Sequence, residues 1–215
     1  LVIIGGEGST KGATALSKIS KTKCVVIPAT IDKDMPLVGP TIGFDTAINT
    51  ALSAIDKIRD TATTSNVTHI VEVMGRNCGW LGILAGIGAG AEVTIIPEVK
   101  IDIAKLSKKI KNQLDRGKKG CIIILAEGGF SKGGSSLAGA LKKKGDFDLR
   151  ITTLGHMQRG GNPSALDRVL ATELGVNAVN ALKNGLSKII IAKPFDCVET
   201  VSYTHLTLPT TKQVW

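Results

Sequence analysis

Two carboxylates stand one residue apart, Asp32 and Asp34, in the stretch PATIDKDMP that spans residues 28–36. The preceding letters KCVVIP are typical of a strand that ends, and Pro28 and Pro36 restrict the backbone on either side. Such a loop could be a turn, because Asp hydrogen-bonds its own backbone in turns. It could also do chemistry, with one carboxylate as a general base and the other as a metal ligand. Taken alone, the stretch favours the turn.

Three further polar clusters have the composition of anion-binding sites. GGEGSTKG, residues 5–12, joins a strand to a helix, where backbone N–H groups can hold phosphate. Its spacing fits neither a P-loop nor the GxGxxG fingerprint, so a plain tight turn is an equal alternative. MGRNCGW places Arg76 between a strand and a helix, where it would bind phosphate or form an ion pair. GHMQRGG holds His156 and Arg159, a pair that suits an anionic ligand, although a lone His is more often structural.

Alternating strand-like and helix-like segments must position these clusters. Continuous apolar runs rich in Val and Ile predict parallel strands that are buried on both faces. These runs occupy residues 1–6, 24–28, 69–75, 92–98, 120–129, 149–155 and 188–194. Segments with helical spacing separate most of them, which predicts a doubly wound α/β fold. The polar clusters follow the runs, so they fall at the carboxyl ends of strands, where such folds bind ligands.

Composition excludes several classes of protein. The chain has 215 residues, of which 43% are hydrophobic and 21% charged, so it is long and apolar enough for a globular core. Aromatic residues make up 3%, which argues against single-stranded nucleic-acid binding by stacking. The net charge of +9 suits phosphorylated small molecules, although lysine runs are usually solvated helix faces. Four cysteines without a CxxC pair, and no transmembrane or signal segment, predict buried thiols in the cytoplasm.

Taken together, the segments closely resemble the phosphofructokinase family. The matching words are IGGEGS, TIDKD, TIGFDTAINT, VEVMGR, AEG, TLGHMQRGG and DR, in the family's order and spacing over residues 1 to about 199. The resemblance implies an α/β fold of doubly wound, mostly parallel sheets in two Rossmann-like lobes. It assigns residues 1–43 and 156–200 to a nucleotide-binding lobe and residues 44–155 to a fructose 6-phosphate lobe.

The reaction that the resemblance implies is phosphoryl transfer from ATP to the 1-hydroxyl of fructose 6-phosphate, a step of glycolysis, with Mg²⁺ as cofactor. Asp32 would then be the general base in a catalytic loop. Thr30 would hydrogen-bond near the transferred group, and Arg76 would stabilise its charge. Asp34 and Glu7 would stand at the metal positions.

The remaining implied ligands form three sets. The nucleotide phosphates would lie along Gly6, Gly8, Ser9 and Gly12. Fructose 6-phosphate would contact Asp34, Met74, Gly75, Glu127, Arg150, His156 and Arg159, with Arg150 contributed by a neighbouring subunit. The positions that match an allosteric nucleotide site in bacterial members are Arg59, Gly90, Glu92, Arg116 and Lys118. The resemblance also implies a cytoplasmic homo-oligomer, a tetramer in bacterial relatives, with no nucleic-acid or membrane partner.

Several positions depart from the family pattern. Glu7 replaces an Asp, and the extra methylene moves the carboxylate by about one bond length. Lys33 replaces an Asn, and a cation there would lower the pKa of the adjacent Asp32. Val67 stands where a second 6-phosphate arginine is expected. Ala29 is neither the Gly of ATP-dependent members nor the Lys of pyrophosphate-dependent ones, while Gly8 stands where the latter tend to carry Asp, so the two positions lean towards ATP.

Two alternatives within the family stay open. One is a pyrophosphate-dependent enzyme. The other is a non-catalytic regulatory half of a duplicated phosphofructokinase, because the words PAT and GHMQ and the absence of an arginine at Val67 resemble that half. The retained Asp32 disfavours the regulatory half. We also expect a fragment truncated at both ends, since LVIIGG begins inside a strand and the family's C-terminal segment is missing. Whether the fragment is active by itself stays open. Residues 201–215, VSYTHLTLPTTKQVW, read as the translation of a sequencing adapter, and we expect them to be a non-native, irregular tail.

Overall fold

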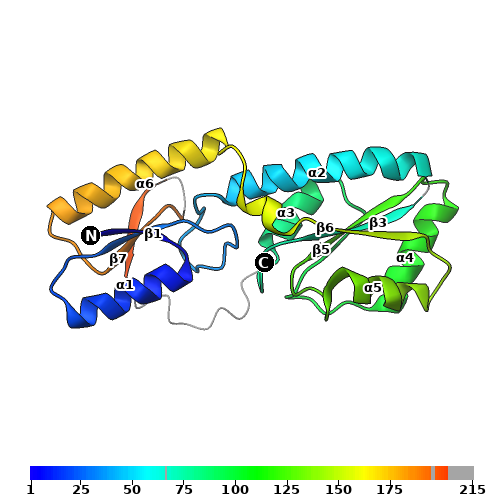
Figure 1. Ribbon diagram of the computed structural model, residues 1–215, viewed down its shortest axis with the longest axis horizontal. Coiled ribbons are helices and arrows are strands. Elements are labelled where there is room, and N and C mark those ends of the chain that lie inside the picture. Colours follow the sequence, from blue (N-terminus) through cyan, green and yellow to red (C-terminus); the bar gives the residue numbers. More distant parts are fainter. Residues whose placement is uncertain (66, 195–196, 203–215) are drawn as a thin grey trace. The chain divides into compact units, whose positions relative to one another are not determined.

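The computed structural model describes residues 1–65, 67–194 and 197–202 (Figure 1). The chain divides into two compact units. The first contains residues 1–46 together with the described residues from 162 onwards, and the second contains residues 47–161. The boundaries predicted from the sequence were 43/44 and 155/156. Which ligand each unit binds stays a prediction.

A four-stranded sheet forms the centre of the first unit. Its strands are β1 (Val2–Gly5), β2 (Val25–Pro28), β7 (Ile189–Ala192) and β8 (Glu199–Ser202), in the order β1-β2-β7-β8. The first three are parallel, and β8 is antiparallel to β7. Val2 pairs with Val25, so the prediction that the two apolar runs form adjacent parallel strands is confirmed.

Two helices cover opposite faces of this sheet (Figure 1). From α1 (Glu7–Ile19), Ala13 packs in one core cluster with Val26 and Ile190. From α6 (Ala165–Lys183), Leu174 packs in another with Ile191. Successive strand residues point to opposite faces, so a strand covered on both sides must be apolar at every position.

The second unit has an entirely parallel sheet among its described strands. These are β3 (Thr68–Val73), β4 (Val93–Ile95), β5 (Cys121–Ala126) and β6 (Leu149–Thr153), in the order β4-β5-β3-β6. Its helices are α2 (Phe44–Ser65), α3 (Trp80–Gly88), α4 (Ile103–Asp115) and α5 (Gly133–Lys142), and the 3-10 helix η1 (Gly155–Arg159) follows β6.

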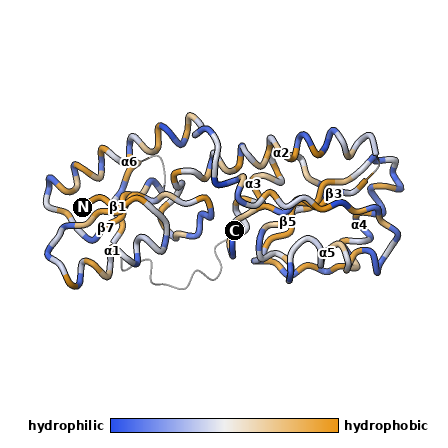
Figure 2. The backbone as a smooth tube through the Cα atoms, viewed as in Figure 1, coloured by the Kyte–Doolittle hydropathy of each residue, from blue (hydrophilic) through white to orange (hydrophobic). Residues whose placement is uncertain are grey.

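Burial explains why β5 reads as a continuous apolar run, whereas the prediction of burial on both faces is wrong for the edge strand β6, where Arg150, Ile151 and Thr153 are exposed. All six residues of β5 are buried, and Leu106 of α4 and Leu137 of α5 pack in the core on one face of the sheet. Figure 2 shows the hydrophobic residues gathered on the strands, while the helices alternate between hydrophobic and hydrophilic residues. The predicted α/β fold of doubly wound, mostly parallel sheets is confirmed. Among the described residues, no helix has the length and apolar character needed to span a bilayer.

The predicted start of the irregular tail is wrong by two residues. Val201 and Ser202 complete β8, where they pair with Ile190 and Ile189 of β7. Thr200 and Val201 are β-branched and suit an edge strand, and Val201 packs against the core that contains Ala13. Residues 203–215 lie outside the described residues, so the non-native origin of the tail stays a prediction.

Candidate active site

The glycine-rich segment connects β1 to α1 in the first unit. Gly6 occupies the N-cap of α1 in an extended conformation, and no side chain caps the helix there. The first N–H groups of a helix have no partner within the helix, so this end can accept an anion. A Cβ built on Gly8 or on Gly12 would meet nothing within 4 Å, so the protein leaves open space along this side of the helix. Glu7, predicted to place the metal, instead pairs with Lys11 at 2.6 Å in this structure.

The loop after β2 lies beside this segment. The backbone N–H of Ala29 donates to the Gly5 carbonyl at 3.0 Å, and a Cβ on Gly6 would lie 3.2 Å from Cβ of Thr30. The Thr30 hydroxyl oxygen accepts from the Asp32 N–H at 3.2 Å, and the Thr41 hydroxyl donates to the Thr30 carbonyl at 2.6 Å. These contacts hold the predicted catalytic loop in one conformation next to the candidate phosphate site.

Both acids of this loop have buried side-chain oxygens. Asp32 is buried, with 3% of its surface exposed. Oδ1 of Asp34 is buried as well, and within the described residues it accepts no hydrogen bond. A buried carboxylate oxygen without a donor suits a cation, and Mg²⁺ commonly takes only one or two carboxylates together with substrate phosphates. The described part of the chain contains no cluster of three or more His, Cys, Asp or Glu side chains that would hold a metal by itself.

Lys33, between the two acids, has a positive φ of 51°. Its Nζ lies 5.1 Å from the centroid of the Phe44 ring, a cation–π distance. The aromatic ring therefore takes part in holding the ammonium group that the sequence placed beside Asp32.

In the second unit, a tight turn after β3 presents Met74, Gly75 and Arg76. Gly75 has φ = 140°, and a Cβ there would lie 2.5 Å from the Cys78 carbonyl oxygen, so only glycine fits. The backbone N–H of Arg76 donates to Oε2 of Glu127 at 3.1 Å. Glu127 follows the neighbouring strand β5. The backbone of Arg76, a predicted catalytic residue, is thus in direct contact with Glu127, a predicted substrate ligand.

The 3-10 helix η1 brings His156 and Arg159 to the same edge of this sheet. Its Gln158 is almost fully buried, with 1% exposed, and Oε1 accepts from the Met74 N–H at 2.9 Å. His156 and Arg159 on either side are exposed. Gln158 therefore fixes η1 to the end of β3. Gln158 lies within the word GHMQRGG but was not predicted to be a site residue; its place between the two predicted ligands His156 and Arg159 was the available signal.

Arg150 lies apart from these residues. It pairs in register with His69, at the start of β3, whereas Met74 follows the end of that strand. At about 3.3 Å per residue, the separation along the strand is about 16 Å. Arg150 is exposed, and its Nε lies 3.7 Å from Oδ1 of Asp148. Val67, where the family pattern expects a second arginine, is buried at the same end of β3.

The environment of His69 is perturbed at that end of the sheet. Burial lowers the pKa of His69, and the nearby Arg150 guanidinium lowers it further. Within the described residues, Nδ1 of His69 is buried without a hydrogen-bond partner. A proton on Nδ1 would therefore add a buried donor with no acceptor, which agrees with the direction of the shift.

Four of the five candidate effector residues come together. Glu92 accepts from the ammonium of Lys118 and from the backbone N–H of Ile122, and the Arg59 guanidinium lies 3.9 Å away. Arg59 also donates to the Gly90 carbonyl at 3.1 Å. Burial raises the pKa of the adjacent Cys121 thiol, and Glu92 raises it further. The fifth residue, Arg116, follows α4 and makes no contact with Glu92 among those that the structure describes.

Comparison with known proteins identifies the family. The family model described as phosphofructokinase matches residues 1–182. ATP-dependent 6-phosphofructokinases of Enterococcus faecalis and Clostridioides difficile are 51% and 49% identical over 191 residues, which cover 89% of this chain and 59% of each relative. The chain therefore spans about three fifths of the length of these relatives.

Solved structures show the same relationship. Phosphofructokinase from Pichia pastoris in the T-state superposes with a TM-score of 0.87 and 32% identity over 98% of this chain and 27% of that chain. Pyrophosphate-dependent phosphofructokinase from Marinobacter aquaeolei has a TM-score of 0.79 at 23% identity, covering 96% of this chain and 59% of that chain, which shows a shared fold alone. With the family match over most of its length, the chain belongs to the phosphofructokinase family.

Proposed function

We propose that the protein transfers the γ-phosphoryl group of ATP to the 1-hydroxyl of fructose 6-phosphate, and so is an ATP-dependent 6-phosphofructokinase acting in glycolysis. The observation that carries the proposal is the buried Asp32 in a loop that Thr30 braces next to the glycine-rich start of α1. A general base has to be held in place, and the phosphates it serves need N–H donors nearby. The names of the relatives at about half identity support the same reaction.

Asp32 is proposed to take the proton from the sugar hydroxyl as the new O–P bond forms. Thr30 would hydrogen-bond the transferred group, and Arg76 would offset its negative charge. Gly6, Gly8, Ser9 and Gly12 would line the nucleotide phosphates. Asp34, whose buried Oδ1 lacks a donor, would hold Mg²⁺, which neutralises phosphate charge when bound. Glu7 would have to leave Lys11 to assist.

The sugar phosphate is proposed to bind at the carboxyl edge of the second sheet. Met74, Gly75 and Arg76 follow β3, Glu127 follows β5, and η1 carries His156 and Arg159. Their common location at one edge supports a single ligand, and the contact between Arg76 and Glu127 supports it further.

Arg150 supports a homo-oligomer. It stands at the opposite end of β6 from η1, about 13 Å along the strand from residue 154 at 3.3 Å per residue. Since it cannot join the residues at the carboxyl edge of its own sheet, we propose that it serves the site of a neighbouring copy in a homo-oligomer, for which a tetramer is the expected size. The glycolytic role would place the protein in the cytoplasm.

ATP is the proposed donor, and Gly8 is the structural argument for it. The space around Gly8 is open, so a nucleotide phosphate can approach the backbone where an Asp side chain would repel it.

Arg59, Gly90, Glu92 and Lys118 are proposed to form an effector site, with Arg116 as a further, separate member.

The test is an assay of the full-length gene product with fructose 6-phosphate and either ATP or pyrophosphate, in which fructose 1,6-bisphosphate is measured. We expect product with Mg²⁺ and ATP, and little with pyrophosphate. Turnover with pyrophosphate alone would overturn the donor assignment. Binding of fructose 6-phosphate without turnover from either donor would overturn the catalytic proposal in favour of a regulatory role.

A further inference from the structure

The 3-10 helix η1 carries two predicted ligands of fructose 6-phosphate, but its own hydrogen bonds are long. The Met157 N–H donates to the Leu154 carbonyl and the Gly160 N–H to the Met157 carbonyl, both at 3.4 Å. Backbone hydrogen bonds are most often about 2.9–3.0 Å long, and 3-10 helices have poorer bond geometry than α-helices. Contacts from outside η1 must therefore keep its ligands, His156 and Arg159, in place.

Glycines at both ends of η1 give its backbone unusual freedom. Gly155 at its start has φ = 53°, and Gly161, just beyond its end, has φ = 111°. A Cβ on Gly155 or on Gly160 would meet nothing within 4 Å, so neighbouring atoms do not confine the chain at these positions. Within η1 one residue is buried, Gln158, so its side chain is the natural anchor of the segment.

The Gln158 amide anchors η1 through one atom. Its Oε1 accepts from the Met74 N–H at 2.9 Å, which is shorter than either backbone bond of η1. Its Nε2 is buried and has no hydrogen-bond partner among the described residues. The Leu154 N–H donates to the Glu72 carbonyl at 3.0 Å, but that contact ends before the ligands begin. The acceptor oxygen of Gln158 is therefore the part of the side chain that holds the ligands.

The turn to which Gln158 binds is held at its other end by a predicted ligand. The Arg76 N–H donates to Oε2 of Glu127 at 3.1 Å. Glu127 is exposed and can reach a substrate, whereas Gln158, with 1% of its surface exposed, cannot. Both side chains fix the backbone of the turn, at Arg76 and at Met74. Gln158 thereby joins the ligands on η1 to the turn that carries the predicted catalytic arginine.

We propose that Gln158 is a positioning residue for the sugar phosphate, whose acceptor oxygen holds His156 and Arg159 in place relative to the Arg76 turn before the ligand binds. The inference rests on the proposed function. Without this bond, η1 would have to be ordered when the ligand binds, and the conformational entropy lost at that step reduces affinity. The effect should therefore fall on the affinity for fructose 6-phosphate more than on the transfer step.

The test replaces Gln158 with Met in the full-length gene product. Met keeps the length of the side chain and removes the acceptor, and the Nε2 donor that is lost with it has no partner among the described residues. We expect the KM for fructose 6-phosphate to rise about fivefold or more, the KM for ATP to stay within about twofold, and kcat to change less than the first KM.

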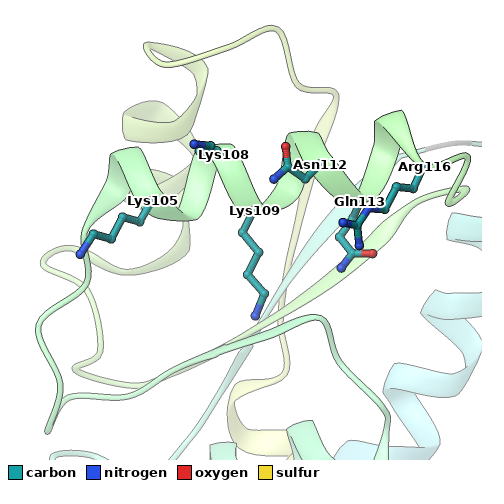
Figure 3. A pocket seen from close by; sticks show the side chains of 6 residues that line it. All are labelled: Lys105, Lys108, Lys109, Asn112, Gln113 and Arg116. Carbon is teal, nitrogen blue, oxygen red and sulfur yellow. The ribbon is translucent and has the colours of Figure 1, made fainter.

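Gln113→Met is the matched control. Gln113 lines a surface groove on α4 beside lysine and arginine side chains (Figure 3). It stands near the end of α4, which leads into β5 at the amino edge of the parallel sheet, whereas η1 follows β6 at the carboxyl edge. The control should leave the KM for fructose 6-phosphate within about twofold of the wild type.

A double-mutant cycle separates positioning from a merely structural role. In an Arg159→Ala background one of the two side chains that Gln158 positions is absent, so Gln158→Met should raise the KM by at most about half the factor seen in the wild type. An equal rise in both backgrounds would overturn the proposal, and so would an unchanged KM for fructose 6-phosphate or an equal rise in the KM for ATP. Circular dichroism checks folding. If Gln158→Met is not folded, Gln158→Asn, whose shorter amide draws the acceptor back from Met74, is measured with Gln113→Asn.

The proposed function can fail separately from this inference. If the wild type turns over with neither donor, binding of fructose 6-phosphate to the same variants is measured by isothermal titration calorimetry. Binding that is about fivefold weaker or more in Gln158→Met would then support the positioning role without catalysis. A wild type that neither binds nor converts fructose 6-phosphate would overturn both.

Discussion

At the scale of single residues, Asp32 decides whether the loop after β2 is catalytic. Asp32→Asn keeps the shape of a side chain that is 3% exposed but removes the base. Because general-base catalysis contributes about 10²–10⁴-fold, we expect kcat to fall by at least about two orders of magnitude, with little change in the affinity for fructose 6-phosphate. Steady-state kinetics and a thermal melt are measured together. A variant that loses activity only in proportion to lost folded protein would assign Asp32 to the turn.

Arg150 should give the opposite kinetic pattern. Its side chain is 66% exposed and its partner is another exposed residue, so Arg150→Ala should leave the melting temperature nearly unchanged. If the guanidinium holds the sugar phosphate before and during transfer, KM for fructose 6-phosphate should rise about tenfold or more while kcat changes less. An unchanged KM would remove Arg150 from the binding site.

His69 should make stability depend on pH. The pKa of His69 in the folded state lies below its ordinary value near 6.5, so the unfolded chain binds the proton more readily. The stability that neutral His69 provides is fully present above the pKa of the unfolded chain. It is lost as the pH falls from that pKa through the lower pKa of the folded protein. We expect the free energy of unfolding to decrease between about pH 7 and about pH 5 by more in the wild type than in His69→Asn. Parallel curves for the two proteins would contradict this.

At the scale of elements, one carboxylate joins the start of α2 to α6. Asp167 is buried, and it accepts from the N–H groups of Gly43 at 2.9 Å and Thr46 at 2.8 Å, as well as from the Thr46 hydroxyl. It therefore caps α2 from a distant part of the chain. Asp167→Asn turns one acceptor into a donor, and we expect a loss of about 1–3 kcal/mol in the free energy of unfolding. Denaturant titration measures it, with exposed Asp115→Asn as a control that should change little.

The helices and strands differ in how far the sequence could predict them. The strands were predictable because β2 and β5 are buried on both faces, which requires an apolar residue at each position. The long-range cap by Asp167 was not, since its partners are more than a hundred residues away and nothing local in DR indicates them. β8 was missed because an edge strand has little apolar periodicity. The place of Arg150 away from the other predicted ligands depends on strand register, which follows from the pairing of β3 with β6 rather than from motif spacing.

At the scale of the whole molecule, the location of Arg150 makes a testable statement about subunits. If each active site takes Asp32 from one chain and Arg150 from a neighbour, two defective full-length proteins should complement each other. In an Asp32→Asn and Arg150→Ala mixture that is dissociated and reassembled, the Arg150→Ala chain supplies an intact base and its Asp32→Asn neighbour supplies an intact arginine. With random assembly, roughly a quarter of the sites should contain both groups, as symmetric oligomers with shared sites require.

The control is each variant dissociated and reassembled alone, which should stay at its own low activity. Activity is measured at a fructose 6-phosphate concentration well below both KM values, where we expect Arg150→Ala to keep at most about a tenth and Asp32→Asn at most about a hundredth of the wild-type rate. Recovery towards roughly a quarter of the wild-type kcat/KM supports a shared site in a closed oligomer. Without recovery, while light scattering shows mixed oligomers, Arg150 must act within its own chain or not at all. That outcome would require η1 and the start of β6 to serve different ligands, because the strand between them holds the two ends apart.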